Sequence, residues 1–263
     1  MFKKKIRIAV IIACRLKSKR LARKALIKID KNFSLIDKCI INSKLINPNF
    51  QVILATSNLK QDKPLINVAK KNNIKCVKGS AENVIIRYLK ACKNFKIDIV
   101  IRVTGDCPYI SKEIAELLLN KHFKSKAEFT RARKFPIGAS CEIINTKALK
   151  KVLKYKRNPL YSEYMSFYFL NNPKIFKINN VNLPKWMIKN YRLTVDYFED
   201  IKFFRKVYSH FRNKNLEFNL KNLYKFLKKN PTIPDINSNL AVKYLDDKKL
   251  INSIYNETKF KKK

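Results

Sequence analysis

The stretch IAVIIACRLKSKRLARKAL, residues 8–26, determines how the rest of the chain is interpreted. It begins with a continuous apolar run, residues 8–12, of the kind found in strands that are buried on both faces of a parallel sheet. Six of the eleven residues from Cys14 to Lys24 are Arg or Lys. Ligands of open α/β sheets bind where strands end, and these basic side chains suit polyphosphate oxygens. The stretch therefore predicts a phosphate site at the end of a central strand, with a solvated basic loop as the alternative that charge alone leaves open.

Strand and helix patterns alternate after this stretch. The expected elements are strands at residues 52–55, 74–77 and 97–103 and helices at residues 33–46, 62–71, 82–95 and about 111–123. Strands that alternate with helices of this length form parallel sheets with right-handed crossovers. We therefore expect an α/β fold with a mainly parallel, doubly wound sheet and helices on both faces.

The second half of the chain has a less regular pattern. The expected elements are strands at residues 127–131, 141–145, 175–181 (an edge strand) and 191–195, helices at residues 161–170 and 198–211, two further helical segments from about residue 219, and a frayed Lys-rich end at residues 260–263. The helix at 198–211 would begin with the acidic pair Glu199-Asp200, as the helix dipole prefers. The chain contains no internal repeat and no long linker. We therefore predict a main domain at residues 1–235 and a C-terminal helical tail at residues 236–263.

Composition narrows the class of protein. No run reaches the ~18 consecutive apolar residues of a membrane span. The apolar run near the N-terminus is too short for a signal peptide and has no small-residue cleavage site, so we interpret it as a strand. The six cysteines are scattered without a C-x-x-C pair, and only two histidines accompany them. Neither a disulfide framework nor a zinc site is encoded, so we expect a cytoplasmic protein without a membrane partner.

The formal net charge of +40 would ordinarily indicate a nucleic acid or an anionic surface as partner. However, the 59 basic and 19 acidic residues are interleaved with core-type apolar positions along the whole chain. Such a spread is typical of a compositional bias rich in Lys, Ile and Asn. Specific nucleic-acid binding is therefore the less favoured alternative for the main function.

Glycine occurs only three times, so each glycine is expected where a side chain does not fit. Gly79 and Gly105 follow predicted strands, and Gly138 lies in a Phe-Pro-x-Gly turn. Gly79 and Gly105 therefore fall on the same edge of the sheet as the basic loop, together with the carboxylate of Asp106. Ordinary turns explain each glycine singly, but they do not explain this grouping.

The basic loop is also the first of several ordered motifs. Arg15, Ser18, Arg20, Leu21 and Lys24 fit the pattern R-x-x-S-x-R-L-P-G-K. The motifs that follow are Ala55-Thr56-Ser57, Lys78-Gly79-Ser80, Arg87-Tyr88, Arg102-Val103-Thr104-Gly105-Asp106-Cys107-Pro108, Phe135-Pro136-Ile137-Gly138 with Glu142, Glu163, and Arg192-Leu193-Thr194-Val195-Asp196 with Glu199-Asp200. Over about residues 6–210 the chain thus resembles the sugar cytidylyltransferase family. The nearest branch is the spore coat polysaccharide biosynthesis type, which is related to acylneuraminate and ketodeoxyoctonate cytidylyltransferases.

This resemblance implies a Rossmann-like nucleotide-diphospho-sugar transferase fold of the glycosyltransferase A type. It also implies an inserted arm at about residues 131–190, which forms the dimer in relatives. CTP would bind at the basic loop, an oxygen of a sugar or sugar acid would attack the α-phosphate, and pyrophosphate would leave. The product would be an activated sugar for a cell-surface polysaccharide. The expected partners are therefore CTP, a sugar or sugar acid, and a second copy of the chain.

The resemblance also assigns roles by position. The catalytic residues would be Arg15, Lys24 and Asp106; the nucleotide-binding residues Arg15, Ser18, Arg20, Lys24, Thr56, Ser57, Gly79, Ser80, Arg87 and Gly105; the acceptor-binding residues Gly138, Glu142 and Glu163. Asp106 and Asp196 would each close a strand and together hold the cofactor Mg²⁺, which takes carboxylate and phosphate oxygens. Two carboxylates that close would repel each other without a cation. The alternative role of Asp106 and Asp196 is to cap the helices that follow them.

Several positions depart from the family pattern. The Gln two residues before Arg15 is Ala13, the first loop Gly is Lys17, and the Pro-Gly pair is Ala22-Arg23. On the acceptor side, Arg-Glu-His reads Ser162-Glu163-Tyr164, and an Asp before Glu142 is replaced by Ser140. These departures leave open an unusual acceptor, or a weakened homologue that binds its ligands without turnover. Cys107 is expected to pack and not to act as a nucleophile, since no histidine lies near it in the sequence.

Overall fold

The computed structural model describes residues 5–18, 20–240 and 247–260, so residues 241–246 of the predicted tail and 261–263 of the predicted frayed end lie outside it. The main sheet has seven strands in the order β5-β4-β1-β6-β8-β7-β9. They are β1 (Ile8–Ala13), β4 (Gln51–Ser57), β5 (Lys75–Gly79), β6 (Ile99–Thr104), β7 (Phe129–Ala132), β8 (Glu142–Asn145) and β9 (Ile178–Val181). A separate hairpin pairs β2 (Lys28–Asp30) with β3 (Phe33–Ser34).

The sheet is mainly parallel, which confirms the predicted fold class. β1 pairs in parallel with both β4 and β6, and β4 pairs in parallel with β5. β8 is antiparallel to both of its neighbours, β6 and β7. Since β6 and β7 are both antiparallel to β8, they run in the same direction as each other. The carboxyl ends of β1, β4, β6 and β7 therefore lie at one edge of the sheet, where the ligands of such folds bind.

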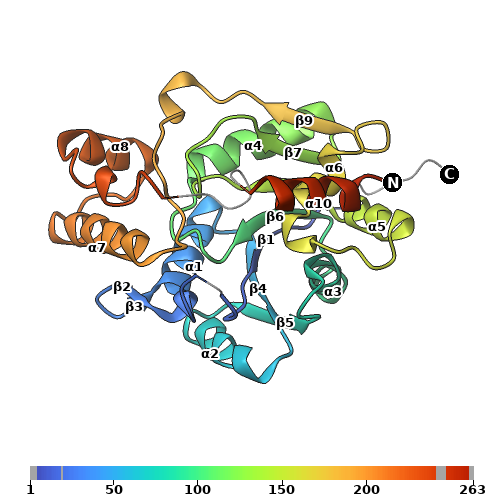
Figure 1. The fold of residues 1–263 in the computed structure, drawn as a ribbon, viewed down its shortest axis with the longest axis horizontal. Coiled ribbons are helices and arrows are strands. Elements are labelled where there is room, and N and C mark those ends of the chain that lie inside the picture. Colours follow the sequence, from blue (N-terminus) through green and yellow to red (C-terminus); the bar gives the residue numbers. More distant parts are fainter. Residues whose placement is uncertain (1–4, 19, 241–246, 261–263) are drawn as a thin grey trace.

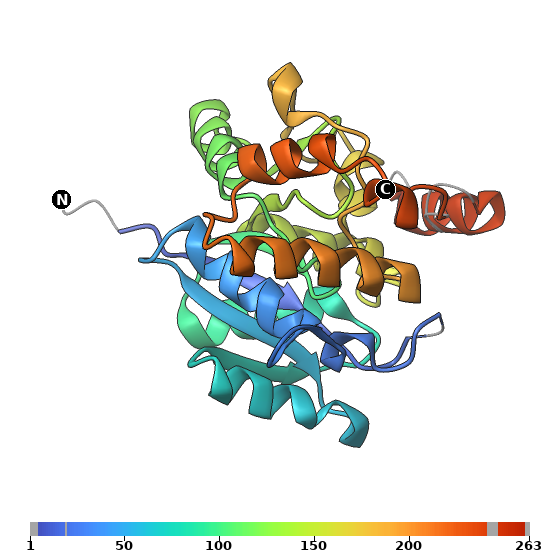
Figure 2. The same ribbon diagram turned by 90° about the vertical axis from the view of Figure 1, so that its left-hand side faces the viewer.

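Helices cover both faces of the sheet. The α-helices are α1 (Leu35–Ile46), α2 (Pro64–Lys71), α3 (Val84–Phe95), α4 (Lys112–Ser125), α5 (Thr146–Tyr155), α6 (Ser166–Leu170), α7 (Phe198–Asn213), α8 (Leu220–Lys229) and α10 (Lys248–Thr258). Short 3₁₀ helices are η1 (Lys24–Leu26), η2 (Lys60–Asp62), η3 (Ser162–Tyr164), η4 (Lys185–Met187) and η5 (Pro234–Ile236). α1, α2, α4, α7 and α8 pack into one buried cluster, and α3, α5 and α6 into the other. In Figures 1 and 2, α1 and α7 lie on one side of the central strands and α3 on the opposite side.

The apolar run of β1 is explained by burial on both faces. Val10 and Ile12 belong to one buried cluster, whereas Ala9 and Ile11 belong to the other, and all four are 0% exposed. Burying a Val or Ile side chain contributes about 1.5–3 kcal/mol. The strand that carries the basic loop is therefore among the most firmly held parts of the fold.

Capping shifts the predicted start of the first helix. The helix predicted at residues 33–46 begins at Leu35, because Ser34 and Asp37 form a capping box. The Ser34 hydroxyl accepts the Asp37 N–H, and the Asp37 carboxylate accepts the Ser34 N–H at 2.8 Å. Phe33 pairs with Asp30 of β2 instead of entering the helix.

The prediction of a strand at residues 191–195 is wrong. An isolated parallel bridge joins Ile137 to Arg192, and no strand forms in this fully described segment. Its amides bond to loops: Leu193 N–H donates to Ile137 O at 2.6 Å, and Val195 N–H donates to Asp106 O at 2.9 Å. The segment is therefore extended and paired, but with turns and not with a strand.

Two further expectations for the second half are wrong, and one helix was not predicted. The single helix predicted at 161–170 is divided into η3 and α6, and Tyr161 enters η3 with a left-handed φ of 51°. α5 was not predicted. Phe260 is not frayed, because its ring stacks on Tyr155 at 4.9 Å and its N–H donates to the Asn172 side chain at 2.9 Å.

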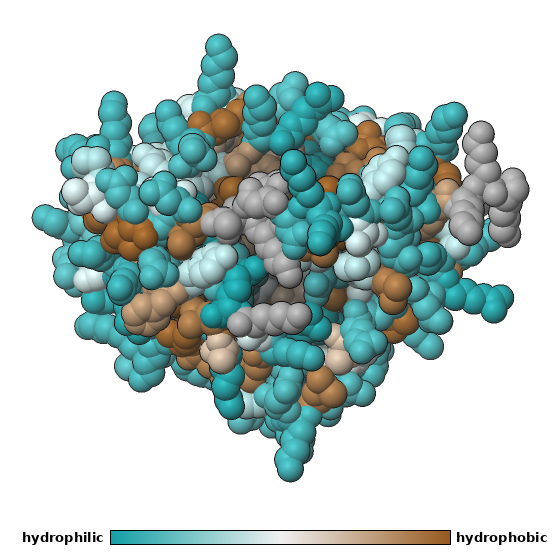
Figure 3. Space-filling model, viewed as in Figure 1, coloured by the Kyte–Doolittle hydropathy of each residue, from teal (hydrophilic) through white to brown (hydrophobic). Residues whose placement is uncertain are grey.

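The surface is mainly hydrophilic on the face that Figure 3 shows, with apolar side chains in small separate groups. None of the helices in residues 5–18, 20–240 and 247–260 combines the length and the apolar character that crossing a bilayer requires.

Candidate active site

The ammonium of Lys24 lies between two carboxylates from distant parts of the chain. Its Nζ is 3.2 Å from Asp106 Oδ2 and 2.9 Å from Asp196 Oδ1, and it also donates to Val195 O. Lys24 opens η1 at the end of the basic loop, Asp106 follows β6, and Asp196 precedes α7. The two aspartates lie 82 and 172 positions from Lys24 in the chain. The edge of the sheet thus assembles a charged cluster that has no local counterpart in the sequence.

Charges within this cluster change the proton affinities of its members. Burial would lower the pKa of Lys24, but the negative charges of Asp106 and Asp196 outweigh burial and raise that pKa. Burial would likewise raise the pKa of Asp196, but the charges and hydrogen bonds of Lys24 and Arg20 outweigh it and lower that pKa. At neutral pH the ammonium and the carboxylate of Asp196 are therefore both ionised.

Two guanidinium groups complete the surroundings of Asp196. Arg20 Nη2 forms an ion pair with Asp196 Oδ1, and Arg192 Nη2 lies 3.1 Å from Asp196 Oδ2. Arg192 is a site residue that the sequence prediction missed. Its spacing of four residues before Asp196, within the same motif, was the available signal.

A second group of ion pairs connects the predicted acceptor residues to the basic loop. Arg15 Nη2 lies 2.7 Å from Glu163 Oε2, and Arg15 Nη1 donates to Ala81 O at 3.2 Å. Arg102 Nη1 lies 2.8 Å from Glu142 Oε2, and Arg102 Nη2 donates to Glu163 O at 2.8 Å. Arg102 was also missed, although it is the one charged residue in the apolar strand β6 and lies opposite Glu142 in the register.

Buried polar groups with unused hydrogen-bonding capacity lie at the ends of β4 and β5. Arg87 is 2% exposed, and its Nε and Nη1 have no partner among the described residues. Burial lowers the pKa of Arg87. A Cβ at Gly79 would lie 2.8 Å from Arg87 Cγ, so a side chain at position 79 would displace the stem of Arg87. The Thr56 hydroxyl is buried and also has no partner within residues 5–18, 20–240 and 247–260, whereas the Ser57 hydroxyl bonds to Asp62.

Serine side chains shape the two loops beside this group. The Ser18 hydroxyl accepts the Leu21 N–H at 3.4 Å within the basic loop. The Ser80 hydroxyl accepts the Asn83 N–H at 3.0 Å in the turn before α3. The structure thus gives Ser18 and Ser80 a turn-forming contact, and their contact with a nucleotide stays a prediction.

Close backbone contacts at two glycines position the aspartates. A Cβ at Gly105 would lie 2.7 Å from Cys14 Cβ, so the backbone before Asp106 packs directly on the end of β1. Gly138 has a φ of +92°, and a Cβ there would lie 2.2 Å from Leu193 O. Gly138 therefore lets its turn lie against the segment that leads to Asp196, while its predicted contact with the acceptor stays a prediction.

The basic loop keeps a left-handed turn without its glycine. Arg23, which replaces the Gly of the family pattern, has φ 51° and ψ 26°. Left-handed backbone costs a residue with a side chain roughly 1–2 kcal/mol. The departure at Arg23 thus places a strained and charged residue at this turn.

Cys107 is buried beside the charged cluster. Burial, followed by the charge of Asp106, raises the pKa of its thiol to about 12. A thiol that stays protonated is a poor nucleophile, in agreement with the predicted packing role.

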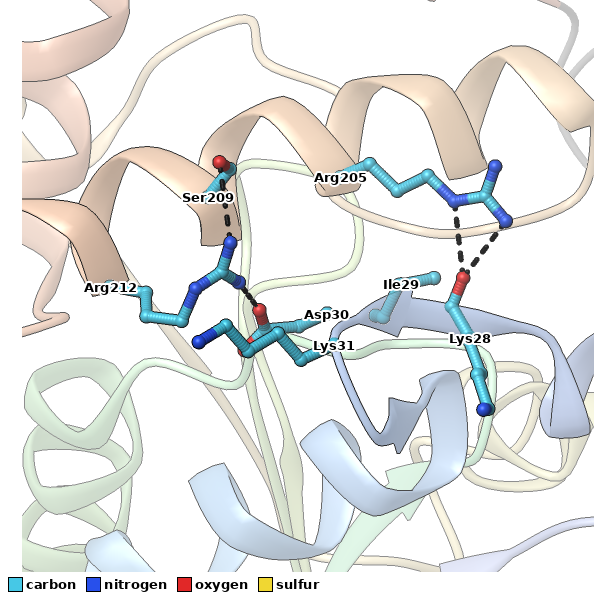
Figure 4. A pocket seen from close by; sticks show the side chains of 7 residues that line it. All are labelled: Lys28, Ile29, Asp30, Lys31, Arg205, Ser209 and Arg212. Atoms are coloured by element: carbon cyan, nitrogen blue, oxygen red, sulfur yellow. Dashed lines mark hydrogen bonds and ion pairs between the residues drawn. The ribbon is translucent and has the colours of Figure 1, made fainter.

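A separate cavity of about 340 Å³ lies between the β2–β3 hairpin and α7 (Figure 4). Its guanidinium groups are already engaged, since Arg205 donates to Lys28 O through Nε and Nη2 and Arg212 forms an ion pair with Asp30. These contacts attach the hairpin that follows the basic loop to α7.

Comparisons with known proteins show which family the chain belongs to. The family model described as cytidylyltransferase matches residues 9–241. The chain is 28% identical over 247 residues to the uncharacterized protein MJ1063 of Methanocaldococcus jannaschii, which covers 90% of this chain and 97% of that protein. It is 26% identical over 159 residues to the spore coat polysaccharide biosynthesis protein SpsF of Bacillus subtilis, covering 60% of this chain and 66% of that protein.

Solved structures share the fold. A cytidylyltransferase from Leptospira borgpetersenii superposes with a TM-score of 0.80 at 28% identity, covering 90% of this chain and 99% of that chain. A CMP:2-keto-3-deoxy-manno-octonic acid synthetase shares the fold, with a TM-score of 0.61 at 15% identity over 78% of this chain and 99% of that chain. Since the family model spans most of the chain, the protein is a nucleotidyltransferase and belongs to the cytidylyltransferase family.

Proposed function

We propose that the protein transfers CMP from CTP to a sugar or sugar acid and releases pyrophosphate, for the synthesis of a cell-surface polysaccharide. The observation that carries this proposal is the cluster in which Lys24 of the basic loop meets Asp106 and Asp196. The names of two relatives support it: SpsF is named for spore coat polysaccharide biosynthesis, and the synthetase for a CMP-linked sugar acid, in a complex with CTP.

The basic loop would bind the triphosphate. Arg15, Arg20 and Lys24 would contact its oxygens and offset the charge that develops on the leaving pyrophosphate. Arg15 can exchange its partner at little cost, because Arg15 and Glu163 are 37% and 49% exposed and such surface pairs contribute about 0–1 kcal/mol. The α-phosphate would then lie between the loop and the acceptor residues.

Asp106 and Asp196 fit a Mg²⁺ ion. Both carboxylates reach one ammonium, so a cation of similar position can contact both. No group of three His, Cys, Asp or Glu that could hold a metal occurs in the described part of the chain. Two carboxylates nonetheless suit Mg²⁺, which fills its other positions with phosphate oxygens and water. When bound, the ion would polarise the phosphate and align nucleophile and leaving group.

Glu142 and Glu163 would face the acceptor. Glu142 is fixed by Arg102 and also accepts the Ser166 hydroxyl at 2.6 Å. Carboxylates held in this way are suited to accept hydrogen bonds from sugar hydroxyls, whether the sugar is neutral or acidic.

Pyrophosphate release tests the proposal directly. The full chain is incubated with CTP, ATP, GTP or UTP, Mg²⁺, and a panel of neutral and acidic sugars. CTP is expected to support release with at least one acceptor and the other three nucleotides much less. Equal binding and equal turnover of all four would contradict the proposal.

A matched pair of lysine variants locates the triphosphate site. Lys24→Met removes charge-assisted contacts worth about 1.5–3 kcal/mol, so CTP affinity should fall roughly ten- to over a hundredfold. Lys151→Met is the control, because Lys151 also contacts a carboxylate, Glu128, and a backbone oxygen, but on another part of the sheet. Titration calorimetry should show weaker CTP binding for Lys24→Met alone, and equal affinities would contradict the assignment.

A further inference from the structure

A buried network holds Asp196 from the side opposite Lys24. Asp200 is 0% exposed and accepts the N–H groups of Asp196 at 2.7 Å and of Tyr197 at 3.0 Å. Arg192 bridges the two carboxylates, since its Nε lies 2.8 Å from Asp200 Oδ1 and its Nη2 lies 3.1 Å from Asp196 Oδ2. Backbone and side chain of Asp196 are therefore fixed together.

The network ends in a residue from the C-terminal part of the chain. Asn237 is 2% exposed, and its Nδ2 donates to Asp200 Oδ1 at 2.8 Å and to Arg192 O at 3.2 Å. Asn237 lies just after η5 and beyond the boundary predicted at residue 235. The segment expected to be a tail thus contributes a side chain to the surroundings of the charged cluster.

The number of hydrogen bonds that each carboxylate accepts separates the role of Asp200 from that of Asp196. Asp200 accepts five hydrogen bonds, from Arg192 twice, Asp196, Tyr197 and Asn237. A carboxylate offers about four lone-pair positions, so Asp200 has none left for a ligand. Asp196 instead directs Oδ1 to Lys24 and Arg20, while Arg192 holds its Oδ2. Of Asp196 and Asp200, Asp196 is therefore the one that presents an oxygen to Lys24 and Arg20.

We infer that Asp200, Arg192 and Asn237 are positioning residues that hold Asp196 in place for a divalent cation, an inference that rests on the proposed function. Groups behind a metal ligand fix its orientation, and their loss typically costs about 10–100-fold in metal affinity or activity. Asp200 also caps α7, whereas Asn237 takes no part in that cap. Substitution of Asn237 therefore tests the positioning role without removing the helix cap.

The experiment measures Mn²⁺ binding to the full chain, with CTP present, as the loss of the electron paramagnetic resonance signal of free Mn²⁺ beyond the loss in an equal CTP solution without protein. Asn237→Ala should weaken Mn²⁺ binding about 10–100-fold and leave metal-free CTP affinity unchanged. Asn172→Ala is the control, since Asn172 is also buried and its amide donates to Tyr168 O and Thr258 O, joining α10 to α6. This variant should lower thermal stability without weakening Mn²⁺ binding.

Each outcome decides one question. Equal Mn²⁺ affinities in Asn237→Ala and wild type, or equal losses in Asn237→Ala and Asn172→Ala, overturn the positioning role while leaving the proposed function intact. A wild-type protein that binds no Mn²⁺ with CTP overturns the metal assignment and the inference with it. Circular dichroism verifies folding, and Asn237→Ser, which retains a hydroxyl donor, replaces Asn237→Ala if the latter does not fold.

Discussion

Lys24 balances Asp106 and Asp196 without any metal. The repulsion between these two carboxylates was expected to require Mg²⁺, but an ammonium within 3.2 Å of both provides the compensating charge. A divalent cation must therefore compete with Lys24 for the same oxygens. Metal binding is expected to be strongest when a triphosphate draws the ammonium away.

The two aspartates should act as one unit. Asp106→Asn and Asp196→Asn should each lower Mg²⁺-dependent pyrophosphate release by about 10²–10³, and the double variant should lose little more. Asp235→Asn, at an exposed position, should retain full activity. Steady-state rates with and without chelator give the comparison. Losses that multiply in the double variant would mean that the aspartates act separately.

Restoring glycine should have opposite effects on stability at Arg23 and at Lys17, the two positions where the family pattern has glycine. Arg23→Gly relieves a left-handed φ of 51°, so its free energy of unfolding should be unchanged or higher by up to about 1 kcal/mol. Lys17 does not have a positive φ, so Lys17→Gly should lower that free energy by about 0.5–1 kcal/mol. Urea unfolding of the ligand-free variants measures both. A larger loss for Arg23→Gly than for Lys17→Gly would show that the loop is not strained.

At the scale of elements, the capping box of α1 predicts an acid-dependent contribution to stability. Burial would raise the pKa of Asp37, but hydrogen bonds from Ser34 and Asn72 and the charge of Lys71 outweigh it and lower that pKa. A carboxyl with a lowered folded-state pKa adds stability above its unfolded value, and this stability is lost as the pH falls through the folded value.

Asp37→Asn should therefore destabilise the protein by about 1–2 kcal/mol near neutral pH and by less at about pH 2, where more of the wild-type carboxyl is protonated. Glu116→Gln, whose side chain is 51% exposed, should show little difference at either pH. Denaturant unfolding at both pH values provides the measurement. A difference for Asp37→Asn that stays constant with pH would contradict the lowered pKa.

Burial and local sequence explain why some helices and strands were predicted and others were not. β1 and β6 were found because burial on both faces demands unbroken apolar residues. α5 was missed because it follows β8 directly: Asn145 is both the last residue of β8 and the N-cap of α5, so no turn residues separate strand from helix. Residues 191–195 have strand-like composition, but their partners are the turns at Ile137 and Asp106, which local sequence does not encode.

The candidate site was predictable to a similar extent. The meeting of Asp106 and Asp196 followed from the expectation that strand ends share an edge, although Asp196 does not follow a strand. The ion pair between Arg15 and Glu163 was not predictable, because it joins residues 148 positions apart whose approach depends on how η3 packs. Tertiary packing selects such pairs, and no local pattern records them.

At the scale of the whole molecule, the 59 basic and 19 acidic residues behind the +40 charge are spread along the whole sequence and not gathered into one tract. Binding to duplex DNA should therefore be nonspecific and should fall by about 10³ or more between about 50 and about 200 mM salt. CTP affinity should fall far less, because its contacts lie in a partly buried cluster. Fluorescence anisotropy with both ligands makes the comparison, and DNA binding that survives the higher salt would favour a nucleic-acid function.

The second copy implied by the family resemblance stays a prediction at this scale. Light scattering would report about twice the 31.0 kDa of one chain for a homodimer.

The spacing of the charged cluster along the chain has a consequence for synthesis on the ribosome. The basic loop is translated early, whereas Asp106 is made 82 residues after Lys24 and Asp196 172 residues after it. Asn237, which bonds to Asp200, emerges later still. A nascent chain therefore carries uncompensated cations through most of its elongation. Fragments released by premature termination before Asp196 would lack a carboxylate of the cluster, so transfer activity should arise only when translation is nearly finished.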